Sequence, residues 1–132
     1  MEQLELLRGF QQSWSRLKYW VMSRSQQAYN EIRFLAKGNQ WTSIKQQRYE
    51  EIIEELQTTM PTEQTLTVTY QHIWGYFKKQ VTPAEKRRYE ALMMKNKTVA
   101  IIEFDTFFQK LTKKYSQPYL AKIYWINESP VM

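Results

Sequence analysis

Apolar side chains recur every three or four residues along most of the chain, which is the spacing of one face of an α-helix. In the first 60 residues this pattern predicts three helices. Their apolar stripes are Leu7, Phe10, Trp14, Leu17 and Val21, then Tyr29, Ile32, Leu35 and Ala36, and then Tyr49, Ile52, Ile53, Leu56 and Met60. Ser25 can cap the second helix, Lys37-Gly38-Asn39 can end it, and the third helix follows Trp41.

The second half of the chain continues the pattern. Thr62 can cap a helix that runs through Val81, and Thr82-Pro83-Ala84-Glu85 is a capping box that opens the next one. Residues 98–115 form a further helix, and Ser116-Gln117-Pro118 begins a short last helix that ends near Trp125. The stripes are Leu66, Tyr70, Ile73, Trp74, Phe77 and Val81, then Tyr89, Leu92 and Met93, and then Ile101, Phe104, Phe108, Leu111 and Tyr115.

These elements predict an all-α fold, a compact single-domain bundle of six or seven helices over residues 1–132, with 127–132 as a loose tail. The chain has no cysteine, which excludes disulfides and thiolate sites. No signal peptide is visible at the start, and apolar runs such as Tyr19–Met22 are far shorter than the roughly 20 residues of a membrane span. We therefore expect a soluble, cytoplasmic protein.

The net charge of +6 is unevenly placed. Residues 1–77 carry eight Lys and Arg against eight Asp and Glu, whereas residues 78–132 carry eleven against five. Such an asymmetry favours a polyanionic partner, nucleic acid before membrane, although a solvated surface of basic residues would have the same composition.

The residues for catalysis are scarce. A single histidine and no cysteine leave only carboxylates for a metal, and Glu50, Glu51, Glu54 and Glu55 lie opposite an apolar stripe, as a solvated face would. The three glycines are isolated, so no phosphate-binding loop is formed, and no nucleophile-elbow pattern is present. We predict no catalytic residue, no metal site and no cofactor.

The stretch QHIWGYFKKQ, residues 71–80, holds the histidine. On a helical wheel His72, Gly75, Tyr76 and Lys79 lie opposite the apolar stripe. A glycine within a helix costs about 1 kcal/mol relative to alanine and usually permits close approach of a neighbouring helix or a ligand. Two interpretations stay open: these side chains hydrogen-bond within the bundle, or they form a surface that stacks on a nucleotide.

Basic residues interleaved with tyrosines suit RNA, because phosphates attract the charge and unstacked bases pack on the rings. Tyr76 is the best candidate for stacking. The predicted nucleic-acid-binding residues are Arg16, Lys18, His72, Tyr76, Lys78, Lys79, Arg87, Arg88, Lys113 and Lys114.

A resemblance to a known family covers about residues 10–127 of the chain. It rests on Ser15-Arg16-x-Lys18, Ser25, Tyr29, Gln71-His72-x-x-Gly75-Tyr76-Phe77-Lys78-Lys79, Glu85-Lys86 and Pro118-Tyr119-Leu120. These residues resemble the YbgA-like family of small bacterial helical domains. The chain departs from that family at Trp14, Arg24, Val68 and Lys110, where relatives tend to have histidine or asparagine. If these make a pocket in relatives, part of it is absent here.

Members of that family occur alone or fused to an iron–sulfur thiouracil-desulfidase-type domain. The resemblance therefore implies a non-enzymatic, RNA-binding accessory domain that recognises tRNA, plausibly thiolated, for a desulfidase partner. An alternative is a protein-interaction module that docks on a separately encoded enzyme. A third interpretation is a small-molecule enzyme that uses His72 as acid or base. The sequence leaves the oligomeric state open.

Overall fold

A computed structural model describes residues 2–38 and 40–130 of the chain. Within these ranges the protein has six α-helices, one short 3-10 helix and no strand. The helices are α1 (Glu2–Arg24), α2 (Gln26–Leu35), α3 (Ser43–Leu56), α4 (Glu63–Trp74), α5 (Pro83–Met93), α6 (Ile101–Lys114) and the 3-10 helix η1 (Leu120–Lys122). The predicted all-α bundle is confirmed.

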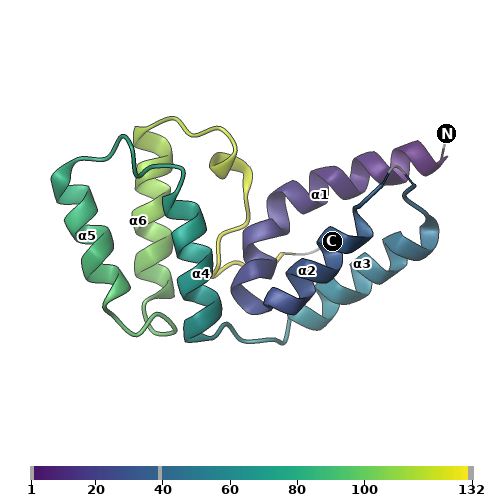
Figure 1. The fold of residues 1–132 in the computed structure, drawn as a ribbon, viewed down its shortest axis with the longest axis horizontal. Coiled ribbons are helices and arrows are strands. Elements are labelled where there is room, and N and C mark those ends of the chain that lie inside the picture. The colour runs from purple at the N-terminus through teal and green to yellow at the C-terminus, as the bar shows by residue number, and fades with distance from the viewer. Residues whose placement is uncertain (1, 39, 131–132) are drawn as a thin grey trace.

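The helices form two lobes (Figure 1). The first lobe comprises α1, α2 and α3, and the second comprises α4, α5 and α6. The C-terminal part of α1 packs on α4, and the chain after α6 returns through η1 across the junction of the lobes. We call residues 116–130 the C-terminal segment.

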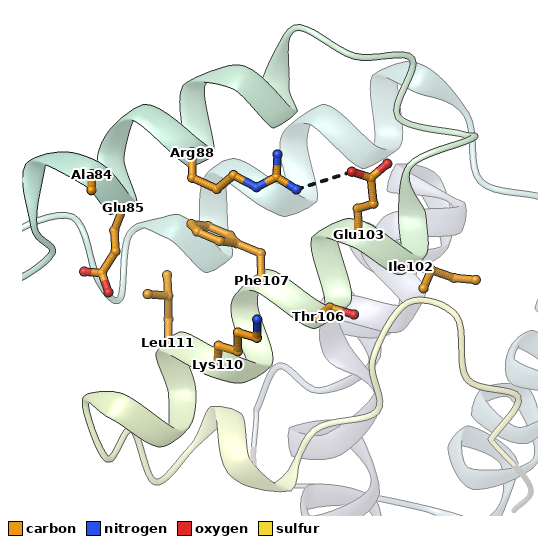
Figure 2. A pocket seen from close by; sticks show the side chains of 9 residues that line it. All are labelled: Ala84, Glu85, Arg88, Ile102, Glu103, Thr106, Phe107, Lys110 and Leu111. Atoms are coloured by element: carbon orange, nitrogen blue, oxygen red, sulfur yellow. Dashed lines mark hydrogen bonds and ion pairs between the residues drawn. The ribbon is translucent and has the colours of Figure 1, made fainter.

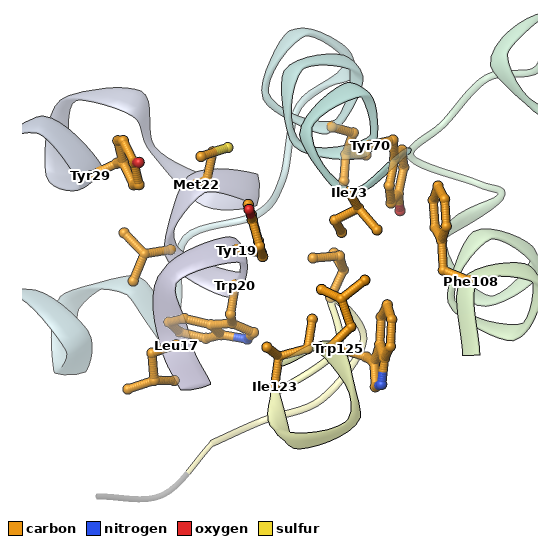
Figure 3. Close-up of a cluster of buried hydrophobic side chains, with 14 of the residues drawn as sticks. Leu17, Tyr19, Trp20, Met22, Tyr29, Tyr70, Ile73, Phe108, Ile123 and Trp125 are labelled. Atoms are coloured by element: carbon orange, nitrogen blue, oxygen red, sulfur yellow. The ribbon is translucent and has the colours of Figure 1, made fainter. Parts of the chain in front are cut away.

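One hydrophobic core runs through both lobes and contains buried side chains from all six α-helices and the C-terminal segment. Ile73 of α4 lies between the aromatic side chains of α1 and those of α6 and the C-terminal segment (Figure 3). The apolar stripes predicted from sequence supply most of this core. Met60 is an exception, because α3 ends at Leu56 and leaves the Met60 side chain 79% exposed.

Helix starts follow the predicted caps. The Ser25 side chain accepts a hydrogen bond from the Ala28 amide, and Thr62 accepts one from the Thr65 amide. Thr82 and Glu85 form the reciprocal capping box that opens α5. At the end of α2, Gly38 has φ +81°, a left-handed conformation that glycine adopts without strain; Asn39 lies outside the described residues.

The helix predicted from Thr62 through Val81 was too long, because α4 ends at Trp74. The Gly75 amide is shared between the Gln71 and His72 carbonyls at 3.2 Å each, and the Phe77 amide then bonds to the Trp74 carbonyl three residues back, at 2.9 Å. This tightening to 3-10-type turns ends the α-helix while keeping Phe77 buried, so the apolar stripe outlasts the helix.

The end of the chain also differs from the prediction. Instead of a helix through Trp125, only η1 forms, because the Tyr124 amide donates to the Arg16 carbonyl of α1 at 2.9 Å rather than to its own turn. The predicted loose tail is wrong as far as Pro130, whose carbonyl accepts a 2.7 Å hydrogen bond from the Gln57 side chain. Residues 131–132 lie outside the described residues. Similarly, α6 begins at Ile101 and not at residue 98.

Candidate nucleic-acid interface

Three segments meet at one end of the second lobe: residues 75–82 after α4, the first turns of α5, and the last turn of α6 (Figure 1). Glu85 joins α5 to α6, because its carboxylate accepts a 2.7 Å hydrogen bond from Lys114 Nζ and another from the Tyr115 hydroxyl. Lys114 lowers the pKa of Glu85 to about 2, with help from Tyr115 and the Thr82 amide. At neutral pH the Glu85 carboxylate is therefore charged, and its oxygens accept hydrogen bonds from Lys114 and Tyr115.

The same end carries a cluster of exposed cations, which we call the basic end. It consists of Lys78, Lys79, Lys86, Arg87, Lys113 and Lys114. Among the residues that the structure describes, only Lys114 has an ion-pair partner, Glu85. Lys113 and Lys114 also sit in the last turn of α6, where cations are favoured by the helix dipole. The remaining cations have no partner in the described part of the chain, so their charge is open to solvent.

Beside the basic end lies a cluster of three tyrosines from distant parts of the chain: Tyr19, Tyr76 and Tyr119. The Tyr19 and Tyr76 hydroxyls share a 3.1 Å hydrogen bond. The ring of Tyr119 stacks on that of Tyr76, with centroids 5.9 Å apart, and its hydroxyl donates to the Ser15 carbonyl at 2.6 Å. Burial raises the pKa of Tyr119 to about 12, and burial with the Tyr76 contact raises the pKa of Tyr19. Tyr76 thus contacts α1 and is not free to stack.

His72 and Gly75 precede Tyr76 in the chain and take no part in the hydrogen bonds and ring contacts of this cluster. His72 is exposed in the last turn of α4. A Cβ added at Gly75 would meet only the His72 carbonyl at 3.1 Å and the Gln71 carbonyl at 3.8 Å. The expectation that Gly75 admits a neighbouring helix is therefore wrong; the crowding comes from its own preceding turn.

The two predicted cations of α1 have different surroundings. Lys18 Nζ lies 5.8 Å from the centroid of the Tyr19 ring, and Lys18 and Tyr119 both line a shallow groove of about 420 Å³. Arg16 instead packs on the C-terminal segment, with its guanidinium 4.6 Å from the centroid of the Tyr124 ring. Lys18 is therefore beside the tyrosine cluster, whereas Arg16 holds the C-terminal segment.

Arg88 lies away from the basic end, in a groove of about 460 Å³ between α5 and α6 (Figure 2). Its guanidinium is 3.4 Å from the Glu103 carboxylate, which also pairs with Lys95 at 2.8 Å. Phe107 lies inside the groove, and Ile102 at its border is 65% exposed. Arg88 thus shares the Glu103 carboxylate with Lys95 and is only partly neutralised.

The structure also has a buried polar junction that sequence reasoning missed. The Arg24 guanidinium donates to the Ile126 carbonyl at 3.0 Å, while the Asp105 carboxylate accepts from the Asn127 amide at 2.9 Å. Burial raises the pKa of Asp105 to about 6 and lowers that of Arg24 to about 10. Burial and the nearby Asp105 carboxylate raise the pKa of Tyr70, whose hydroxyl has no hydrogen-bond partner among the described residues. A charged residue beside Phe104, on the apolar side of α6, was the available signal.

The described residues give no sign of a metal centre or a membrane span. No three of their histidine, aspartate or glutamate side chains come together in a way that could hold a metal ion. None of their helices combines the length and the apolar character needed to cross a bilayer.

The fold and this interface define a small helical domain with one basic end. Residues 18–130 match the sequence model of the family described as Protein of unknown function (DUF1722), and the chain belongs to this family. No curated protein matches the chain. No solved structure matches it either.

Proposed function

We propose that this protein is a non-enzymatic RNA-binding domain that holds its ligand at the basic end. The observation that carries the proposal is the convergence of exposed cations from three segments, of which only Lys114 is ion-paired within the described residues. Counterion release from a polyanion makes such a surface a source of affinity. The whole excess of positive charge lies in residues 78–132, which supports the same assignment.

The favoured ligand is tRNA. Support comes from the resemblance of residues 71–79 to the YbgA-like family, whose members occur beside thiouracil-desulfidase-type domains. In this proposal the protein delivers tRNA, thiolated or not, to a desulfidase partner in the cytoplasm. The partner supplies the cysteine chemistry, because this chain has no cysteine.

The test compares two triple charge reversals in the two lobes. One replaces Lys78, Lys79 and Arg87 with Glu; Arg88 is left intact because it pairs with Glu103. The matched control, on the first lobe, replaces Arg8, Arg33 and Lys37 with Glu. These three are exposed cations without a salt bridge to any described residue. Both variants change the net charge by the same amount, so a general loss of attraction affects them equally.

We expect the basic-end variant to bind tRNA on the order of 100-fold more weakly than wild type, with a log–log salt slope smaller by about 3. The first-lobe variant should retain most of the affinity and the slope. Equal loss in both variants would mean that net charge, and not a site, attracts the RNA. Undiminished binding of tRNA by the basic-end variant would show that the basic end is not the binding site.

Docking of a partner protein is a second candidate function, and the groove between α5 and α6 favours it. Its apolar interior at Phe107 and Leu111 has the character of a site for an amphipathic helix. Both glutamates of the groove, Glu85 and Glu103, are already paired with cations, whereas Lys110 has no ion pair with a described residue. The helix that fits best therefore carries acidic side chains.

Two further variants separate docking from RNA binding. Ile102→Lys places a charge at the border of the groove, and Ile44→Lys places one on an exposed apolar residue of α3, 79% exposed against 65% for Ile102. If the groove docks a desulfidase-type protein, the Ile102 variant loses co-purification with that protein while keeping its affinity for tRNA. Retention of the partner by the Ile102 variant would exclude the groove.

A further inference from the structure

The basic end consists of lysine and arginine side chains, and the tyrosine and tryptophan rings beside it are packed within the protein, which decides what part of an RNA it can hold. We propose that the basic end binds the phosphate backbone of double-helical RNA and does not read bases, thiolated or otherwise. This inference rests on the proposed function and names the part of the ligand that is recognised. It also replaces the expectation that Tyr76 stacks on a nucleotide.

The tyrosines next to the basic end already contact one another through their rings and hydroxyls. The ring of Tyr76 is stacked against Tyr119 on one side and meets the edge of Tyr19 in a T-shaped contact, with centroids 6.3 Å apart. The hydroxyls of Tyr76 and Tyr119 bond to Tyr19 and to the Ser15 carbonyl. A base could stack here only by breaking protein contacts, so these rings are poor platforms for single strands.

The other rings near this end are also engaged. Trp74 stacks on Tyr89 with an interplanar angle of 2° and a centroid distance of 4.1 Å. Tyr115 donates to Glu85, and Lys114 Nζ lies 5.2 Å from the centroid of its ring. The most exposed aromatic side chain among the described residues, Phe34, is 71% exposed and lies on α2 of the other lobe.

Two side-chain amides near this end, a type of group that reads base edges through paired hydrogen bonds, each make one hydrogen bond within the protein. Gln80 Nε2 donates to the Tyr76 carbonyl at 3.3 Å, and Gln117 Oε1 accepts from the Tyr119 amide at 3.1 Å. The cationic groups exposed at the basic end are five ammonium groups and one guanidinium on flexible stems, and the His72 side chain is also exposed, in the last turn of α4. Such groups suit phosphates, whose positions are regular in a duplex, and double-stranded RNA is recognised mainly through its shape and backbone.

The experiment measures binding of the full chain to four RNA probes at one salt concentration. The probes are an RNA duplex of about 16 base pairs, an unstructured RNA strand with as many phosphates, and tRNA with and without 4-thiouridine. We expect the duplex to bind about tenfold more tightly than the unstructured strand, and thiolation to change the affinity of tRNA by less than about twofold. Tyr76→Phe keeps the ring and removes its hydroxyl, and it should leave all affinities unchanged.

The outcomes separate this inference from the function on which it rests. Tighter binding of the unstructured strand, or a clear preference for thiolated tRNA, would overturn backbone recognition while leaving RNA binding in place. Binding of neither duplex nor strand, nor of tRNA, would overturn the proposed function and this inference together. Replacement of Tyr119 by Phe removes the bond to the Ser15 carbonyl and serves as the matched control for Tyr76→Phe.

Discussion

The two lobes are built alike inside and differ outside. In the first lobe Phe10 stacks on Trp41 with centroids 3.9 Å apart, and in the second Tyr70 stacks on Phe104 at the same distance. On the surface the first lobe presents the exposed glutamates of α3, whereas the second presents the basic end. Aromatic residues therefore say little about function in this protein, because both lobes use them for packing, and the placement of charge is what separates the lobes.

The two lobes are joined by a shared hydrophobic core and by the C-terminal segment. The core is continuous across their junction, and the C-terminal segment binds both α1 and α6 through backbone groups. We therefore expect the two lobes to unfold together as one unit, as the single domain predicted from the sequence would.

The largest effect is expected at Ile73, which is fully buried between the lobes. Ile73→Ala removes three methyl or methylene groups from the shared core and should lower the free energy of unfolding by about 2–5 kcal/mol. Because one core serves both lobes, amide hydrogen exchange should accelerate equally in α3 and α6. Exchange that accelerates in α6 alone would show two independently stable lobes.

The next effect distinguishes the two arginines that hold the C-terminal segment. Arg24 is partly buried and donates to the Ile126 carbonyl, so Arg24→Ala leaves that acceptor and the nearby Asp105 carboxylate without a cation. We expect a loss of about 2–3 kcal/mol in urea-induced unfolding. Arg16 is exposed, and Arg16→Ala should cost less than about 1 kcal/mol. Equal losses of unfolding free energy in the two variants would mean that burial of Arg24 does not add to its contribution to stability.

A change at Asp105 should act in the opposite direction. The pKa of about 6 in the folded protein lies above the ordinary value of 3.8, so the folded state holds the proton more tightly than the unfolded state. Stability from this group is therefore present at low pH and lost as the pH rises through about 6. Asp105→Asn should be more stable than wild type by about 1–2 kcal/mol at pH 7.5.

Urea titrations at several pH values check the sign of this effect. The advantage of Asp105→Asn should shrink as the pH falls from about 6 to about 4, where wild type regains the proton. An advantage that is independent of pH would show that the carboxylate is not the cause. A less stable variant at pH 7.5 would show that the Asn127 contact outweighs the burial of charge.

The smallest effect is expected at Tyr76. Tyr76→Phe removes the hydrogen bond to Tyr19 and keeps the ring stack with Tyr119, so unfolding should become easier by about 0.5–1.5 kcal/mol. The affinity for RNA should not change. Thermal unfolding and a parallel RNA titration test the two parts, and weaker RNA binding by a folded variant would restore Tyr76 as a contact residue.

Features decided by neighbouring residues could be predicted from the sequence. The caps at Ser25, Thr62 and Thr82 depend on side chains within three positions, and all three form as expected. The basic residues 78, 79, 113 and 114 could likewise be expected at the surface. That they share one end of the second lobe required the packing of α4, α5 and α6.

Features decided by distant residues could not be predicted. Tyr76 has the spacing of an outward-facing residue, but its partners Tyr19 and Tyr119 lie in other segments, and only the fold brings them together. The turns that follow the end of α4 bring Tyr76 against Tyr119 of the C-terminal segment, a contact between residues far apart in the sequence. The junction of Arg24 and Asp105 has no local pattern beyond a charge on an apolar face.

The C-terminal segment also has a consequence for how fast the protein folds. Helical bundles usually fold quickly because their contacts are local. Here Trp20 donates to the Glu128 carbonyl across 108 positions, and Arg24 reaches the Ile126 carbonyl across 102. These pairings require closure of nearly the whole chain, so the helices can form and collapse before the segment docks. The buried charges of Arg24 and Asp105 gain their partners in that step, so we expect docking of the segment to be the slow stage of folding.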